Sequence, residues 1–230
     1  MNFSGIKYGD KLVLAALACV FLSTPLTLTQ AAITCPCSEL KVPPAPAKDI
    51  DPVGGLAFMK TPEYKKEFAD AIAGARKACM KHLGEKNVAI VSDIDETCLD
   101  NSEHFKSGTG WGDWVSWEAE ARDPVLKQTA DFLAWARKNG FAVFFITGRS
   151  EVSRAATIRN LVRAGLSYDG LYMRPGNDDL PAADFKASYR KKIADMGFNI
   201  IVNIGDQYSD LKGGYAEDCE KLPNKIYYIK

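Results

Sequence analysis

The chain has 230 residues, 47% of them hydrophobic, and its 29 basic and 29 acidic side chains give a formal net charge of zero. This composition is that of a globular protein with an apolar core, and it excludes an intrinsically disordered chain. It provides no basic footprint of the kind that binding a nucleic-acid polymer requires, so we expect small partners and no nucleic-acid polymer.

Residues 1–32 have the pattern of a secretory signal peptide. Lys7 and Lys11 precede the apolar run LVLAALACVFL, and Pro25 and the small residues of TQAA follow it. A charged segment, an apolar segment and small residues in this order are typical of a cleaved leader. We therefore expect an exported protein, periplasmic or secreted, cut near Ala31 or Ala32.

Cys19 offers an alternative, a lipoprotein anchored to the membrane through this residue. It follows LAALA, which is a weak lipid-attachment signal because Ala16 stands where a larger aliphatic residue is usual. A soluble product is favoured, and we expect membrane contact only if Cys19 carries lipid.

The cysteines beyond the leader fit an oxidising compartment. Cys35 and Cys37 form a CPC sequence that can pair with Cys79 or Cys219. The pairing among Cys35, Cys37, Cys79, Cys98 and Cys219 stays open. No second cluster of cysteine or histidine completes a zinc site.

Residues 33–60 are rich in Pro and Gly and lack periodicity, which predicts an extended tether. From Thr61 the pattern becomes helical, with Thr61 as the cap, Pro62 in the first turn and Gly84 after the last apolar position. We expect the folded domain to span residues 61–230.

Strands and helices then alternate along the chain. Apolar runs predict strands at 87–92, 141–147, 170–173, 199–204 and 225–229, and amphipathic patterns predict helices at 123–140, 150–165 and 184–197. Asp123 is expected to cap the first of these helices and Gly140 to end it. Continuously apolar strands separated by helices indicate an α/β fold of three layers, Rossmann-like, with a parallel sheet covered on both faces.

Acidic side chains follow the predicted strands at one edge of this sheet. Asp93 and Asp95 follow one strand, Thr147 ends a second, and Asp206 follows a third, with Asp210 one helical turn further on. Ligands bind beyond the carboxyl ends of strands in such sheets. Several carboxylates at one edge require a cation, and this oxygen-rich set suits Mg²⁺.

Four motifs in this order carry a resemblance to a known family. DIDET from Asp93, FFITGR ending at Arg149, the lysine of DFKASYR and IGDQYSD resemble the four motifs of the haloacid dehalogenase (HAD) superfamily. DIDETCLDNSEH, ITGR and GDQYSDL look most like its secreted acid phosphatases, which include bacterial class C enzymes such as lipoprotein e and the plant acid phosphatases. The resemblance covers roughly residues 88–211.

Phosphoryl transfer needs an in-line nucleophile, charge neutralisation and a proton for the leaving oxygen. We expect Asp93 to be the nucleophile that forms an aspartyl phosphate, and Asp95 to be the general acid and base. Thr147 and Lys186 are expected to bind phosphate oxygens. Arg149 is a further phosphate-binding candidate that can alternatively brace the loop.

The resemblance also implies how Mg²⁺ would be held. Its ligands would be the Asp93 carboxylate, the Asp95 main-chain carbonyl and Asp206. Asp210 would reach the ion through water or support the other ligands.

A short insertion at about 101–122 predicts a small helical cap. Trp111, Trp114 and Trp117 recur in it every three residues. They either pack on the domain or form an aromatic wall that stacks a nucleobase or phenyl leaving group.

These expectations describe an exported, Mg²⁺-dependent acid phosphatase that hydrolyses small phosphate monoesters, with nucleoside 5′-monophosphates as one candidate substrate. One alternative is a catalytically weak storage or binding protein on the same fold, as in the plant vegetative storage proteins. Another is a phosphotransferase, which would use the same residues.

Overall fold

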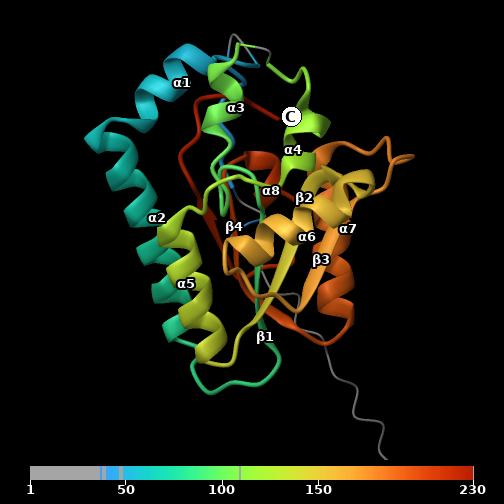
Figure 1. Cartoon of the computed structure of the whole chain (residues 1–230). Helices are drawn as coiled ribbons and strands as arrows, with labels where there is room; N and C mark the ends of the chain where they lie inside the picture. The colour runs from blue at the N-terminus through green and yellow to red at the C-terminus, as the bar shows by residue number, and fades with distance from the viewer. Residues whose placement is uncertain (1–36, 38–39, 47–48, 109, 230) are drawn as a thin grey trace, which may run out of the picture. The chain divides into compact units, whose positions relative to one another are not determined.

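The computed structural model describes residue 37, residues 40–46, residues 49–108 and residues 110–229 (Figure 1). The predicted leader, Cys19 and Cys35 lie outside these ranges. The helices are α1 (Pro52–Met59), α2 (Pro62–Met80), α3 (Ser102–Lys106), α4 (Trp114–Glu120), α5 (Lys127–Lys138), α6 (Arg154–Arg163), α7 (Ala182–Asp195) and α8 (Tyr208–Leu211), with a 3₁₀ turn η2 (Glu151–Ser153). The strands are β1 (Val88–Ser92), β2 (Ala142–Ser150), β3 (Gly170–Arg174), β4 (Asn199–Gly205) and β5 (Asp218–Lys221).

The five strands form one parallel sheet in the order β3-β2-β1-β4-β5. The strand β1 therefore lies at the centre, with β2 and β4 on either side. In this register Ala89 pairs with Ala142 and Val88 with Asn199. The carboxyl ends of β1, β2 and β4 consequently open at the same edge.

Alternate residues of the central strands enter two separate cores. Val88 and Ile90 of β1 pack with α2 and α5, whereas Ala89 and Val91 pack with α7 on the opposite face. Figure 1 shows the sheet between these two groups of helices. The predicted three-layer α/β fold is confirmed, and its apolar strands are explained by burial on both faces.

The predicted tether is wrong for its C-terminal part. Residues 52–59 form α1, and Ile50 pairs with Tyr227 in an antiparallel bridge. A Cβ at Gly55 would lie 2.4 Å from the Ile226 backbone, so this glycine permits a close approach that a tether does not need. Gly55 lets α1 pack on the domain, and Pro52 occupies the first turn of this helix.

The last predicted strand is also wrong. Residues 225–229 do not join the sheet; Ile226 and Tyr227 pack with Phe105 of α3 and with residues of α1. The edge strand is β5, whose residues are only partly buried. We call residues 224–229 the C-terminal segment.

A disulfide joins Cys37 to Cys219 of β5, with the Cα atoms 5.5 Å apart. Cys79 and Cys98 are buried free thiols. The bond closes a loop with a sequence separation of 182 residues and fixes the N-terminal part of the described chain to the sheet edge.

Thr61 caps α2 as predicted, because its hydroxyl accepts a hydrogen bond from the Tyr64 amide at 3.1 Å.

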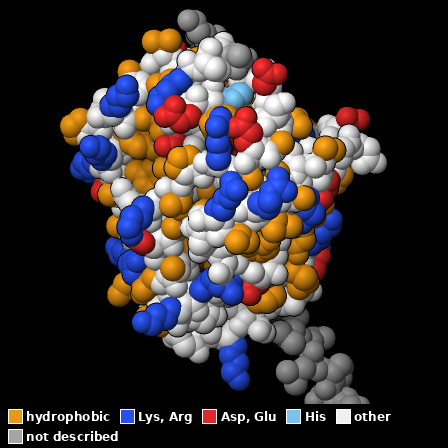
Figure 2. All heavy atoms as spheres, viewed as in Figure 1, with side chains coloured by type: hydrophobic (Ala, Val, Ile, Leu, Met, Phe, Trp, Pro, Cys, Tyr) orange, Lys and Arg blue, Asp and Glu red, His pale blue; other side chains and the backbone are white. Residues whose placement is uncertain are grey.

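On the face shown in Figure 2, Lys and Arg side chains are spread over the surface with Asp and Glu among them. Among the described residues, no helix has both the length and the apolar character needed to cross a membrane.

Candidate active site

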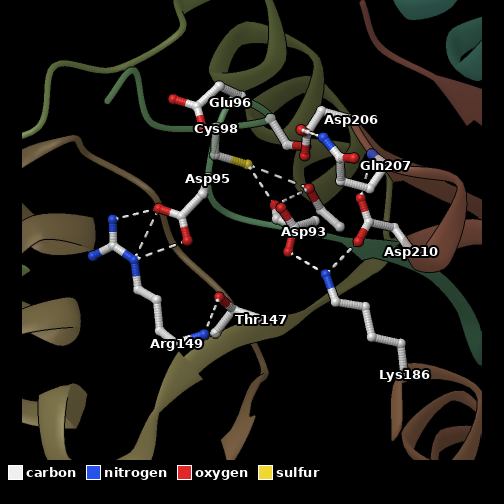
Figure 3. Close-up of polar contacts among 12 residues, drawn as sticks. Asp93, Asp95, Glu96, Cys98, Thr147, Arg149, Lys186, Asp206, Gln207 and Asp210 are labelled. Atoms are coloured by element: carbon white, nitrogen blue, oxygen red, sulfur yellow. Dashed lines mark hydrogen bonds and ion pairs between the residues drawn. The ribbon is translucent and has the colours of Figure 1, made fainter. Parts of the chain in front are cut away.

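The predicted site residues converge at the carboxyl edge of the sheet. Asp93 and Asp95 follow β1, Thr147 lies in β2, and Asp206 follows β4. Lys186 reaches the same place from α7. Figure 3 shows Asp93, Asp206, Lys186 and Asp210 of α8 directed toward one another, whereas the Asp95 carboxylate points away from them.

A buried lysine is shared by two carboxylates in this cluster. The Lys186 ammonium lies 2.5 Å from an oxygen of Asp93 and 2.5 Å from an oxygen of Asp210. All three side chains are at most 7% exposed. Charged groups are buried only when they are paired, and this pairing fixes the position of the predicted nucleophile.

Gly205 at the end of β4 allows Asp210 to approach. A Cβ at Gly205 would lie 2.5 Å from both Cβ and Oδ2 of Asp210. The second oxygen of Asp210 accepts a hydrogen bond from the Gln207 amide at 2.7 Å. The first turn of α8 therefore holds this carboxylate against the end of the strand.

The Asp206 carboxylate is fixed by three donors. Oδ1 accepts a hydrogen bond from the Thr97 hydroxyl at 3.3 Å, and Oδ2 accepts one each from the Gln207 and Asn224 amides at 2.6 Å. Asn224 belongs to the C-terminal segment. That segment thus supports the site directly, which its sequence gave no reason to expect.

Burial raises the pKa of the carboxyl groups in the cluster. Desolvation is the main cause of the raised pKa of Asp93; Lys186 opposes it, and Asp210 and Asp206 reinforce it. Desolvation, followed by the charge of Asp210, raises the pKa of Asp206 to about 6. A cation placed among these groups would lower both pKa values.

The cluster has the donors that a divalent metal needs. Asp93, Asp206 and Asp210 each offer a carboxylate oxygen, and these oxygens lie within 4.8 Å of one another. Among the described residues, Lys186 is the one cation that forms ion pairs with these carboxylates, and Lys221 acts on Asp206 from a greater distance. Buried hard oxygen ligands with uncompensated charge fit Mg²⁺ or a similar hard cation. The Asp95 carboxylate is not among these donors, so only its main-chain carbonyl remains as the expected ligand.

Asp95 is held by Arg149 of β2. The Arg149 Nε lies 3.0 and 3.1 Å from the two Asp95 oxygens, and Nη2 lies 2.6 Å from one of them. The Asn101 amide adds a hydrogen bond at 2.9 Å. Nη2 also reaches Asp123 at 2.9 Å. Because Nε and Nη2 are both occupied by carboxylates, this geometry favours the bracing role of Arg149 over phosphate binding.

Asp123 was predicted as a helix cap, and this prediction is wrong. The helix α5 begins at Lys127, four residues later, and its N-cap position is Leu126. The Asp123 side chain is instead fully buried against Arg149. Sequence reasoning therefore missed a residue of the Asp95 environment, because an aspartate before a helix usually is a cap.

Thr147 is fully buried at the carboxyl end of β2. Its hydroxyl oxygen accepts a hydrogen bond from the Arg149 amide at 3.1 Å. The hydroxyl proton can then point toward a phosphate at the sheet edge. Thr147 is not among the residues that line the cavity described below, so its expected phosphate-binding role stays a prediction.

A cavity of about 290 Å³ opens above the cluster. Asp93, Asp95, Lys186, Asp206 and Asp210 line its floor, and its walls include Trp111, Trp114, Phe185, Tyr227 and Ile229. Two of the three predicted tryptophans therefore face the cavity.

Trp117 does not line this cavity. Its indole nitrogen donates to the Asn101 side chain at 3.0 Å, and Arg122 lies over its ring. Tyr227 contributes to the wall instead, with its ring centroid 4.9 Å from that of Trp111. Its phenol also donates a short hydrogen bond to the buried carboxylate of Glu96.

The fold and the order of the site residues are those of the HAD superfamily. A sequence profile described as HAD superfamily, subfamily IIIB (acid phosphatase), matches residues 45–230. The chain therefore belongs to this subfamily of acid phosphatases, which are phosphoric monoester hydrolases.

Individual relatives agree with this assignment. Acid phosphatase 1 of Solanum lycopersicum is 33% identical over 186 residues, which cover 75% of this chain and 72% of the relative. A stem 28 kDa glycoprotein of Glycine max is 32% identical over 61% of this chain and 59% of the relative. Vegetative storage protein 2 of Arabidopsis thaliana is 28% identical over 65% of this chain and 60% of the relative. The chain thus spans about three fifths of the length of these last two relatives.

Among solved structures, the class C acid phosphatase from Bacillus anthracis has the same fold. It aligns with a TM-score of 0.65 at 24% identity, over 76% of this chain and 83% of that one.

Proposed function

We propose that this acid phosphatase is an exported, Mg²⁺-dependent enzyme that hydrolyses phosphate monoesters through an aspartyl phosphate on Asp93. One observation carries the proposal: three buried carboxylates have oxygens within 4.8 Å of one another, and among the described residues Lys186 is the one ammonium group that forms ion pairs with them. A site with this charge is stable when it holds a divalent cation and is otherwise costly to bury.

The positions of the side chains support the following course of the proposed reaction. Lys186 and Thr147 bind oxygens of the substrate phosphate, and the Asp93 carboxylate attacks phosphorus from the floor of the cavity. The bond from phosphorus to the ester oxygen breaks, and the protonated Asp95 carboxyl gives its proton to that leaving oxygen, which departs as the alcohol. Asp95 then accepts a proton from the water that attacks the aspartyl phosphate, which releases inorganic phosphate and restores Asp93.

Mg²⁺ bound by Asp93, Asp206 and Asp210 would neutralise negative charge on the transferred phosphoryl group. Lys186 and Asp95 lie on opposite sides of Asp93 in Figure 3, which suits a phosphate-binding role for the lysine and a proton-transfer role for Asp95. The lysine lies beside Asp93, and Asp95 lies apart from the carboxylate cluster, next to Arg149.

The cavity walls favour substrates with an aromatic leaving group. Trp111, Trp114 and Tyr227 present aromatic rings above the phosphate position. Stacking on such rings contributes about 1–3 kcal/mol per base and is tolerant of base identity. Nucleoside 5′-monophosphates and aryl phosphates are therefore the substrates we propose.

Export is supported by the Cys37–Cys219 disulfide, because such bonds persist in oxidising compartments. A periplasmic or secreted protein fits this bond together with the predicted leader. Attachment through Cys19 is the alternative location.

A storage or binding role is the competing proposal, since a relative is named as a vegetative storage protein. The presence of Asp93, Asp95 and the lysine-paired cluster argues for an enzyme instead. A storage protein needs none of these buried charges.

The test measures phosphate release from adenosine 5′-monophosphate, 4-nitrophenyl phosphate and glycerol phosphate, with Mg²⁺ or with EDTA. We expect Mg²⁺-dependent hydrolysis that Asp93→Asn abolishes. Trp111→Ala should raise KM for the two aromatic substrates only. Trp135→Ala is the matched control, because this tryptophan lies on α5 against Phe132 and does not line the cavity. Folded wild-type protein that is inactive on all three substrates would support the storage role.

A further inference from the structure

Arg149 lies between two carboxylates, and the mechanism uses only one of them. Its side chain is fully buried, with Asp95 on one side and Asp123 on the other. The Asp95 carboxylate is 13% exposed, toward the cavity, whereas the Asp123 carboxylate is completely inaccessible. Asp123 therefore cannot contact a substrate.

Asp123 is itself anchored to a different part of the fold. The side-chain amide of Asn160, on α6, lies 3.3 Å from the Asp123 carboxylate and 3.3 Å from its main-chain oxygen. Burial raises the pKa of Asp123 and the Arg149 charge opposes this shift. A chain of contacts thus runs from α6 through Asp123 and Arg149 to Asp95.

We propose that Asp123 is a positioning residue for the reaction: it fixes the Arg149 guanidinium, which in turn fixes the Asp95 carboxylate that lines the cavity. The inference rests on the proposed role of Asp95 as the proton donor. A guanidinium is a planar fork, and carboxylates on two of its edges define its plane as well as its position. With Asp95 as its one carboxylate partner, the guanidinium would be fixed along a single edge, and Asn101 alone would then hold Asp95 from another direction.

Positioning of a proton donor has a signature that depends on the leaving group. An alkoxide needs a proton as the ester bond breaks, whereas 4-nitrophenolate is stable enough to leave without one. A displaced Asp95 therefore slows alkyl esters selectively. General acid catalysis contributes about 10²- to 10⁴-fold, so partial displacement is expected to cost about 10- to 100-fold.

The experiment compares kcat/KM for glycerol phosphate and 4-nitrophenyl phosphate in wild type and Asp123→Asn. We expect a loss of about 10- to 100-fold on the alkyl ester and of less than about threefold on the aryl ester. Asp169→Asn is the matched control. It makes the same change at a carboxylate that pairs with Arg137 near the other end of β2, and it should leave the ratio of the two substrates unchanged.

Two further variants separate positioning from a purely structural role. Asn160→Ala removes the amide that anchors the Asp123 carboxylate and should show a selective loss in the same direction; it replaces Asp123→Asn if circular dichroism shows that variant unfolded. Adding Asp123→Asn to Asp95→Asn should cause no additional loss on glycerol phosphate, because the residue to be positioned has lost its function.

Equal losses on both substrates in folded protein, or additive losses in the double variant, would overturn the inference. Wild-type protein without activity on either substrate would instead overturn the proposed function on which it rests.

Discussion

Mg²⁺ should raise the melting temperature of this protein, and the increase should shrink as the pH falls. Burial raises the pKa of Asp206 from 3.8 to about 6. A pKa change of this size corresponds to about 3 kcal/mol of stability. Because the folded-state pKa is raised, this stability is present below about pH 4 and is lost as the pH rises through about 6 when no cation is bound.

A bound divalent cation compensates the negative charge of the carboxylates and restores the stability that is lost when Asp206 ionises. At a concentration of about 100 times Kd, Mg²⁺ would stabilise the folded state by about 2.7 kcal/mol. For a chain of this size each kcal/mol raises the melting temperature by about 2–4 °C, so we expect an increase of about 5–10 °C at neutral pH. Protons compete for the same oxygens, so the increase should disappear as the pH falls below about 5.

Differential scanning calorimetry with Mg²⁺ or EDTA across this pH range measures the effect. Asp206→Asn should lose most of the increase. Asp131→Asn, which removes an exposed carboxylate paired with Lys127 on α5, should retain it. An equal increase in both variants, or none in folded wild-type protein at neutral pH, would refute the assignment of the metal to this cluster.

Three further perturbations have defined outcomes. Lys186→Met should lower kcat by about 10²- to 10³-fold in steady-state assays, because the fixed cation beside Asp93 is lost; a decrease of less than threefold would argue against its role. Gly205→Ala should destabilise the protein by about 1–3 kcal/mol in urea titrations and weaken the response to Mg²⁺, since the added Cβ lies 2.5 Å from Asp210; an unchanged response would show that Asp210 does not support the metal. Cys219→Ser should cost about 2–5 kcal/mol of unfolding free energy, because the bond closes a long loop. A reductant should then destabilise wild type but not this variant.

The central strands could be predicted because burial on both faces demands continuous apolar runs. β1, β2 and β4 therefore follow the hydrophobic pattern closely. β5 has the sequence DCEK and lies at the sheet edge with partly buried side chains, so it carries no comparable signal. The apolar run at 225–229 resembled a strand because apolarity does not distinguish pairing in a sheet from packing on helices.

In the candidate site, too, some residues could be predicted from the sequence and others could not. The sequence allowed the prediction that Asp93, Asp206 and Lys186 lie close together. The ends of parallel strands share one edge of the sheet, which places the two aspartates, and the order of the motifs identifies the lysine. The role of Asp123 depends on a contact with Arg149, 26 positions further along the chain. Tyr227 enters the cavity wall through pairing with Ile50, far away in the sequence. Such tertiary contacts leave no local pattern.

The most direct test of the central claim is to trap the covalent intermediate. Wild-type protein is mixed with substrate and Mg²⁺, quenched in acid during turnover and digested, and the peptide that contains Asp93 is analysed by mass spectrometry. The proposed function predicts one added phosphoryl group on Asp93 in wild type and none in Asp93→Asn. Turnover without any phosphorylated Asp93 peptide, under conditions in which a synthetic acyl phosphate survives the quench, would contradict it.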